Sequence, residues 1–416
     1  MKMTSKLLGR IGKYLQLDLY YYIKNSLYLF TSRIGTNLAR FALSIAFARL
    51  VTQDLYGQWN FVMAIIGICA IVTLPGMNTA IVQSVSTGHD RVLVQGTKQR
   101  FKWSGLGTFV LIGVGLYYWF SGENAIGKSL IIGSLFFPFY HSFLTYNAFF
   151  SGKKQFDKVA KYQLIVHVAS TLVTIGVIYS SRNLILILTA YFLTFSILRG
   201  YFFKIAYQKM EGQSYDPEAV SFGRHLTVTA IPTVIRQHYD RIIIALFLSF
   251  PKLAIYAIAL GFADIIFSFN SIIATLILPK LSQMDQKTAY QEVKKRWPLL
   301  VLGFGIICGI LIALCPYIIP FFYSAKYMDS VFYAQILLIS VIIAAPVPII
   351  NKALFPSQKR IKDLYKLRIY SAIIEIVLLT VLTLKFGLLG AAIAILLGRT
   401  FTTVYSLILA RFIPFR

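Results

Sequence analysis

Four polar residues recur at helical spacing within a hydrophobic stretch near the start of the sequence. They are Arg33, Asn37, Arg40 and Ser44, separated by four, three and four positions. This spacing places all four on one face of a helix. Because a guanidinium group donates paired hydrogen bonds to phosphate or carboxylate oxygens, we expect this face to bind an anion.

Further ionisable residues interrupt hydrophobic stretches in the second half of the sequence. Arg236 and Asp240 are four positions apart, which permits an ion pair within one helix. Asp264, Glu375 and Arg399 each stand among mostly apolar residues. Because the sequence contains no CxxC and no cluster of His and Cys at ligand spacing, neither a metal site nor a bound cofactor is expected.

The composition places these stretches in a lipid bilayer. The 416 residues are 57% hydrophobic and 13% charged, with a mean hydropathy of +0.69. This is too apolar for a soluble domain. Since a helix crosses the hydrocarbon with ~20 apolar residues, we predict an all-α polytopic membrane protein with about twelve spans. They lie near 27–50, 58–84, 103–120, 129–151, 162–180, 184–204, 223–249, 253–284, 297–323, 330–350, 367–385 and 388–411.

The basic residues predict the orientation of these spans. Every second connection is rich in Lys and Arg, for example the connection with Arg91, Lys98, Arg100 and Lys102. The other connections contain only Arg49, Lys128, Arg182, Lys252, Lys326 and Lys385. Because short basic loops stay in the cytoplasm, both termini are predicted to be cytoplasmic. The net charge of +26 is thereby explained without a nucleic-acid partner, and the basic loops favour anionic membrane lipids.

The sequence also divides into two similar halves. At an offset of 200 positions, Asn37 and Arg40 fall on Gln237 and Asp240, and each half contains six predicted spans. We predict an N-terminal six-helix bundle over 1–204, a cytoplasmic linker over 205–222 and a C-terminal six-helix bundle over 223–416. Within the first bundle, Leu8, Ile11 and Leu15 recur beside basic residues, which predicts a helix lying on the membrane surface.

A charge in the bilayer centre costs ~2.5–3.5 kcal/mol even on the mildest scale, so each deep ionisable residue must face a cavity or a partner. Because the first and seventh spans are equivalent in the two halves, we expect them to meet across a central cleft. Two interpretations stay open. The arginines line a cationic cavity for an anionic substrate, or they form structural ion pairs with the carboxylates. Candidates for coupling to H⁺ or Na⁺ are Asp240, Asp264 and Glu375.

Several segments together resemble a known family. They are residues 37–57 (NLARFALSIAFARLVTQDLYG), Gly76 and Ala80, the segment 240–244 with Tyr256, and Pro279 with Ser282. In these segments and in length the chain resembles the O-antigen-type polysaccharide flippases of the multidrug/oligosaccharidyl-lipid/polysaccharide exporter superfamily.

The resemblance implies a fold and a function. It implies two six-helix bundles in a bacterial inner membrane that flip an undecaprenyl-pyrophosphate-linked oligosaccharide, the repeat unit of an O-antigen, capsule or exopolysaccharide, to the outer leaflet by alternating access. A glycan polymerase and other assembly proteins are implied partners. The pyrophosphate would be bound by a cationic cavity of Arg33, Arg40, Arg236 and Arg399, with Asn37 on the same face as the first two.

Two alternatives belong to other classes. A cation-coupled multidrug exporter would share the fold, but an arginine-rich cavity repels a cationic drug. A membrane glycosyltransferase or polymerase would need a large extracytoplasmic loop and a nucleophile with an adjacent base, and the sequence shows neither. We therefore expect a transporter and not an enzyme.

Overall fold

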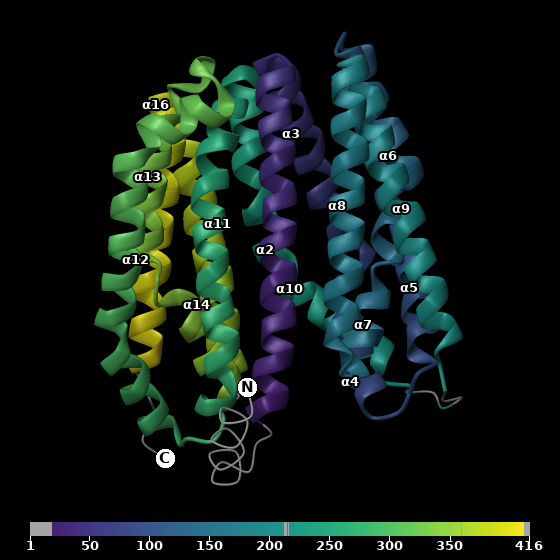
Figure 1. Ribbon diagram of the computed structural model, residues 1–416, viewed down its shortest axis with the longest axis vertical. Coiled ribbons are helices and arrows are strands. Elements are labelled where there is room, and N and C mark those ends of the chain that lie inside the picture. Colours follow the sequence, from purple (N-terminus) through teal and green to yellow (C-terminus); the bar gives the residue numbers. More distant parts are fainter. Residues whose placement is uncertain (1–18, 212–213, 215, 359, 412–416) are drawn as a thin grey trace.

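The computed structural model describes residues 19–211, 214, 216–358 and 360–411, and the regular elements in this part of the chain are all helices (Figure 1). The first half contains α2 (Leu19–Leu50), α3 (Gln53–Cys69), η1 (Ala70–Thr73), α4 (Met77–Ser86), α5 (Val92–Phe120), α6 (Asn124–Ser142), α7 (Thr145–Gly152), α8 (Phe156–Ser181) and α9 (Leu184–Gln208). The second half contains α10 (Ala219–Phe247), α11 (Phe250–Leu281), α12 (Gln286–Tyr323), η2 (Ala325–Tyr327), α13 (Ser330–Ile343), α14 (Val347–Ile349), η3 (Ile350–Leu354), α15 (Phe355–Ser357) and α16 (Ile361–Arg411). The predicted all-α membrane fold is confirmed.

The predicted order of spans can be followed along these helices. The boundary between spans 162–180 and 184–204 lies at Arg182, whose φ is 47°, and Asn183 caps α9 by accepting a hydrogen bond from the Ile185 N–H at 2.9 Å. The last two predicted spans both lie in α16, which is interrupted at Gly387 by a φ of 61°. Arg360 donates to the Leu409 carbonyl at 2.7 Å, so the two segments of α16 run antiparallel.

Several spans are broken helices. The second span is divided at Leu74, whose φ is 54°, followed by Pro75. The tenth span bends by 45° between α13 and the segment 347–357. Breaks of this kind free backbone groups from the helical ladder and are tolerated in membranes where protein surrounds them.

By length and apolar content, seven helical segments among the described residues could each cross a membrane, or eight if the bent tenth span is counted as one. α16 counts once in this number although it contains two antiparallel segments. α2 and α10 are not counted, and these are the helices that carry Arg33 with Arg40 and Arg236 with Asp240. The polar faces of α2 and α10 therefore need neighbouring protein around them.

Helices of the two halves meet mainly at α3 and α4. α3 packs against α10 and α11, and α4 packs against α10. Gly57 in α3 lies against the backbone of Phe250, where a Cβ atom would stand 1.9 Å from the carbonyl oxygen, so this contact requires glycine. The start of α2 and the end of α16 lie at the same end of the molecule (Figure 1). The division at 205–222 and the cytoplasmic location of this end stay predictions.

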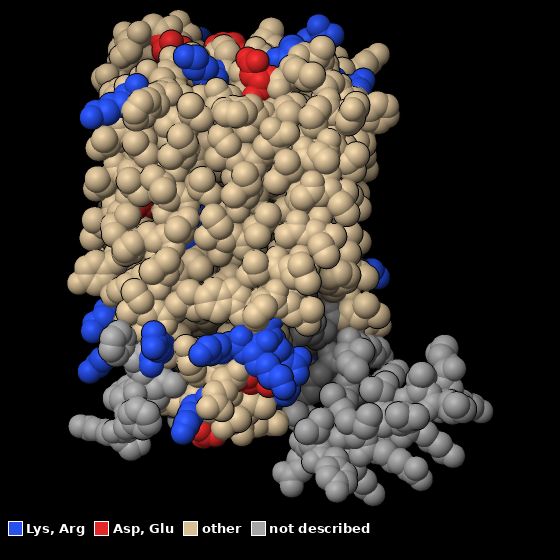
Figure 2. Space-filling view, turned by 90° about the vertical axis from the view of Figure 1, so that its left-hand side faces the viewer, with Lys and Arg blue, Asp and Glu red and all other residues tan. Residues whose placement is uncertain are grey.

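Apolar side chains cover the middle of the outer surface. On the face formed by α12, α13 and α16, nearly all charged side chains lie at the two ends, with Lys and Arg gathered at the lower one (Figure 2). This is the distribution expected of a surface that contacts hydrocarbon.

One predicted location differs from the structure, and one predicted helix lies outside the described residues. Arg100 is predicted in a connection, but it lies inside α5 and is 2% exposed, because α5 begins at Val92 rather than near residue 103. The predicted surface helix with Leu8, Ile11 and Leu15 lies outside the described residues.

Candidate functional site

A polar cavity of about 150 Å³ lies within the first half. Three of its lining residues are the predicted Arg33, Asn37 and Arg40. The others come from α2, α7, α8 and α9 and from the residue before α7, and they are Thr36, Leu144, Tyr146, Asn147, Gln163, Val166, His167 and Arg199. The cavity is large enough for a phosphate-sized group, and its charged side chains are arginines.

The packing of α2 on α8 directs the arginines towards this cavity. Ser32 is 4% exposed and donates to the Ala160 carbonyl of α8 at 3.1 Å. Gly35 leaves room for Leu164, since a Cβ atom there would come within 2.4 Å of it. With this face of α2 held against α8, Arg33 and Arg40 remain exposed on the adjacent face.

Arg199 of α9 completes the cavity, and the sequence analysis missed it. Its guanidinium donates to the Tyr140 carbonyl and lies 4.1 Å from the centre of the Tyr140 ring and 4.8 Å from that of Phe195. The side chain is 5% exposed, and its Nε atom has no hydrogen-bond partner among the described residues. A lone arginine inside the predicted span 184–204 was the signal that could have identified it.

Arg100 is a second buried arginine in this half. It donates to Asn78 Oδ1 at 2.6 Å and lies 3.5 Å from Thr73 Oγ1, both uncharged groups. Within the described part of the chain, neither Arg100 nor Arg199 forms an ion pair, and the same holds for Arg33 and Arg40. The interior of the first half is therefore cationic.

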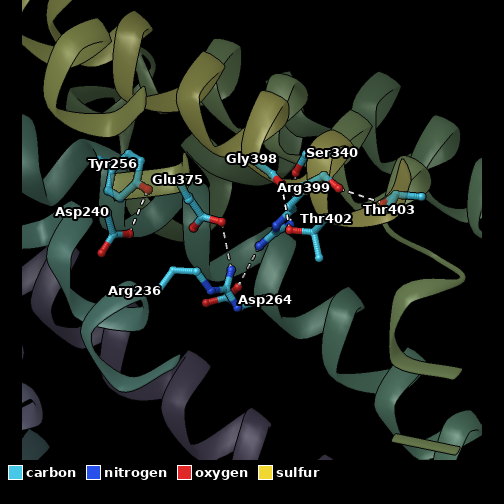
Figure 3. Close-up of polar contacts among 10 residues, drawn as sticks. All are labelled: Arg236, Asp240, Tyr256, Asp264, Ser340, Glu375, Gly398, Arg399, Thr402 and Thr403. Carbon is cyan, nitrogen blue, oxygen red and sulfur yellow. Dashed lines mark hydrogen bonds and ion pairs between the residues drawn. The ribbon is translucent and has the colours of Figure 1, made fainter. Parts of the chain in front are cut away.

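The remaining predicted residues lie in the second half and are paired. Arg236 of α10 lies 3.0 Å from Glu375 of α16, and Arg399 of α16 lies 3.5 Å from Asp264 of α11 (Figure 3). Arg399 also donates to Ser340 at 3.1 Å. The structural ion pairs that the sequence left open as an alternative are thus present for Arg236 and Arg399, and neither residue lines the polar cavity of the first half.

Asp240 makes contacts that differ from those predicted by its spacing. It is 3% exposed and accepts hydrogen bonds from the Tyr256 hydroxyl at 2.9 Å and from the Arg241 N–H at 2.8 Å. Arg236, four positions earlier, pairs with Glu375 of α16 instead. Figure 3 shows the Asp240–Tyr256 contact beside this pair.

One hydrogen bond connects the two groups of residues. Asn37 donates from Nδ2 to Ser268 of α11 at 2.9 Å, and Ser268 is one helical turn from Asp264. The cationic cavity and the paired cluster therefore lie on either side of the contact between α2 and α11.

A set of hydrogen bonds joins the halves at the other end of α2. Gln53 donates to the Lys326 carbonyl at 2.6 Å, and Lys326 Nζ donates to the Val51 carbonyl at 2.8 Å. Arg49 donates to the carbonyls of Phe321 and Phe322. We call these contacts of Arg49, Gln53 and Lys326 the α2–α12 latch.

Among the described residues, no group of three or more His, Cys, Asp and Glu side chains is placed to hold a metal ion. The site combines unpaired arginines, which are suited to an anion, with Asp264, whose side chain is 53% exposed.

One protein family matches this chain. Residues 46–297, more than half of the chain, match the family described as polysaccharide biosynthesis protein. A search of curated proteins finds no significant match.

Three solved structures with a similar fold are titled as a flippase or as transporters. A structure titled lipid II flippase MurJ, inward closed conformation, has a TM-score of 0.70 and 16% identity and covers 94% of this chain and 88% of its own. An inward-facing multidrug resistance MATE family transporter of the MOP superfamily has a TM-score of 0.64 and 10% identity, with 93% and 97% covered. Its outward-facing counterpart has a TM-score of 0.62 and 8% identity, with 94% of each chain covered. At these identities the likeness shows the shared fold alone.

Proposed function

Since this chain belongs to the polysaccharide biosynthesis protein family, we propose that it moves a polyprenyl-pyrophosphate-linked oligosaccharide across a bacterial inner membrane, from the cytoplasmic to the outer leaflet. The glycan would be a repeat unit of an O-antigen, capsule or exopolysaccharide. The likeness to a structure titled as a lipid II flippase supports a lipid-linked substrate.

The observation that carries this proposal is the cavity with unpaired arginines. Arg33, Arg40 and Arg199 line it without a carboxylate partner among the described residues. Holding cations near one another without counter-ions is unfavourable, and a pyrophosphate would supply the missing negative charge. Guanidinium groups are suited to this ligand because their fixed donors match phosphate oxygens.

The proposed mechanism is alternating access between the two halves. The α2–α12 latch holds one end closed through hydrogen bonds to backbone carbonyls, which can break and reform without leaving a buried charge. Opening of the latch end would expose the cavity to the side of the membrane on which the latch lies. The identification of the latch end with the outer surface follows from the predicted orientation.

For the energy source we propose proton exchange at Asp264. Its side chain is 53% exposed, whereas that of its neighbour Glu375 is 3% exposed and paired with Arg236. Protonation of Asp264 would release Arg399, and a charge that crosses 100 mV gains ~2.3 kcal/mol. Asp240, buried against Tyr256, would stay a structural residue.

The test is leaflet translocation of a fluorescent undecaprenyl-pyrophosphate oligosaccharide in proteoliposomes. Wild type is compared with Arg40→Ala and Arg199→Ala, and Lys128→Ala is the matched control because Lys128 is a cation outside the cavity. Strong loss in the cavity variants with normal flipping in the control supports the proposal. Unchanged flipping in both cavity variants would make the arginines structural. Transport of a cationic dye in place of the lipid would favour the exporter.

A further inference from the structure

A second cavity lies on the lipid-facing surface of the other half. It is an open groove of about 760 Å³ between the start of α12 and the end of α16. Its apolar walls are formed by Pro298, Val301 and Leu302 of α12 and by Val404, Leu407 and Ile408 of α16. This is the face on which Lys and Arg gather at the lower edge (Figure 2).

The groove is charged at one end only. Lys294 of α12 and Arg411, the last residue of α16, line that end together with Tyr290 and Trp297. Val404 is two helical turns from Arg411 and Leu302 is a little over two turns from Lys294, so the apolar walls extend about 10 Å from the charged end. Along α12 the order is Tyr290, Lys294, Trp297 and then the apolar wall, so the cations and the interfacial aromatic residues share one end of the groove.

Neither cation is neutralised by the carboxylate nearest in sequence. Glu292 is the partner of Lys280 at 2.6 Å and of Arg296 at 2.8 Å. Lys294 and Arg411 form no ion pair with any residue that the structure describes. Both are exposed.

The bend of the tenth span accompanies this gap between helices. α12 and the last segment of α16 both pack on α13, but beyond the 45° bend the segment 347–357 packs mainly against α11. At the level of the groove, α12 and α16 are therefore left with an open space between them.

We propose that this groove is a binding site for an anionic phospholipid, with the acidic headgroup on Lys294 and Arg411 and an acyl chain along Val301, Leu302 and Ile408. The polarity of the groove matches that of such a lipid, since its charge and its apolar chain lie at opposite ends. An uncharged isoprenoid tail would fill the walls but leave both cations without counter-charge. A zwitterionic lipid would place its own cation beside them.

The test uses Trp297, which lines the groove, as a fluorescent reporter in nanodiscs. The fluorescence of Trp297 is obtained as the difference in emission between wild type and Trp297→Phe. Quenching by brominated phosphatidylglycerol in a phosphatidylcholine background is compared with the reverse mixture. We expect a preference for phosphatidylglycerol. Since one Lys or Arg at a membrane surface favours anionic lipid by a factor of about five, Lys294→Gln with Arg411→Gln should lower the relative affinity about 30-fold.

The matched control is Lys287→Gln with Lys295→Gln, which removes two exposed cations of the same helix that do not line the groove. This variant should retain the preference. Equal quenching of wild type by both lipids would show that the groove contacts lipid without selecting the anionic headgroup. An equal loss in the control would assign the preference to the surface charge as a whole. Displacement of the brominated lipid by neutral polyprenol would assign the groove to an isoprenoid tail, and each of these three results overturns the proposal.

Discussion

The interior arginines of the two halves differ in their partners. In the second half, Arg236 and Arg399 each have a carboxylate partner, Glu375 and Asp264. In the first half, Arg100 and Arg199 are almost fully buried and contact only uncharged groups. Because uncompensated buried charge is costly, this contrast supports our proposal that the first half binds an anionic ligand, whereas Arg236 and Arg399 already have their counter-charges.

The largest effect is expected from breaking a pair in the second half. Arg236→Ala leaves Glu375, which is 3% exposed, without its partner, and this should lower the free energy of unfolding by about 3–5 kcal/mol. Arg236→Met combined with Glu375→Leu should recover most of the loss. Unfolding in mixed detergent micelles measures both. A double variant as unstable as the single one would show that the pair is not self-contained.

The next largest effect is a loss of affinity for the lipid-linked ligand, which should be greater for a variant in the first half than for one in the second. Arg199→Ala removes a donor from the cationic cavity and should weaken binding of an undecaprenyl-pyrophosphate lipid about 10- to 100-fold, as expected for hydrogen bonds to charged groups. Arg199→Lys should recover only part, because an ammonium lacks the planar fork. Arg399→Ala should change affinity much less. Fluorescence titration in detergent measures all three, and equal losses at both positions would contradict the contrast between the halves.

A smaller effect is expected where the halves meet. Lys326→Ala removes one hydrogen bond of the α2–α12 latch, the one from Lys326 Nζ to the Val51 carbonyl. This should cost about 1 kcal/mol and shift the population of the open end about fivefold. Spin labels at Thr52 and Met328, both exposed, report the separation as a distance distribution. Lys128→Ala serves as the control. No change in the distribution would exclude the latch as the closing contact.

The smallest effect is a pH dependence at the end of the first half. Burial opposes the charged form of Lys153, but hydrogen bonds to Asp90 and Glu211, at 2.8 and 3.3 Å, raise the pKa of Lys153 above its ordinary value of 10.5. A group whose pKa is raised on folding stabilises the protein below its unfolded pKa. This stabilisation should therefore be present below pH 10.5 and disappear as the pH rises through the higher folded pKa.

Melting of wild type and Lys153→Met between neutral pH and pH above 10.5 measures this contribution. The difference between them should shrink at the alkaline end. A constant difference would mean that Asp90 obtains its counter-charge elsewhere, which would weaken the contrast between a paired end and an unpaired interior in the first half.

The order of helices could be predicted from the sequence because most spans contain a long apolar stretch. The polar face of Arg33, Asn37 and Arg40 was equally predictable, since helical periodicity is a local property. Arg199 was accessible to the same reasoning but was not selected. Arg100 was assigned to a connection because its helix extends well beyond the hydrophobic core of the span.

The sequence by itself determined that this chain is a helical membrane protein with ionisable residues at bilayer depth. Hydrophobicity and periodicity are local properties that consecutive residues define. Only the tertiary structure decided which charges meet. Arg236 and Glu375 are 139 positions apart, and Arg399 and Asp264 come from helices at opposite ends of the second half. Pairing between distant residues depends on how helices are rotated and packed. It was therefore the fold that gave Arg236 and Arg399 their partners and left Arg100 and Arg199 without any carboxylate partner among the described residues.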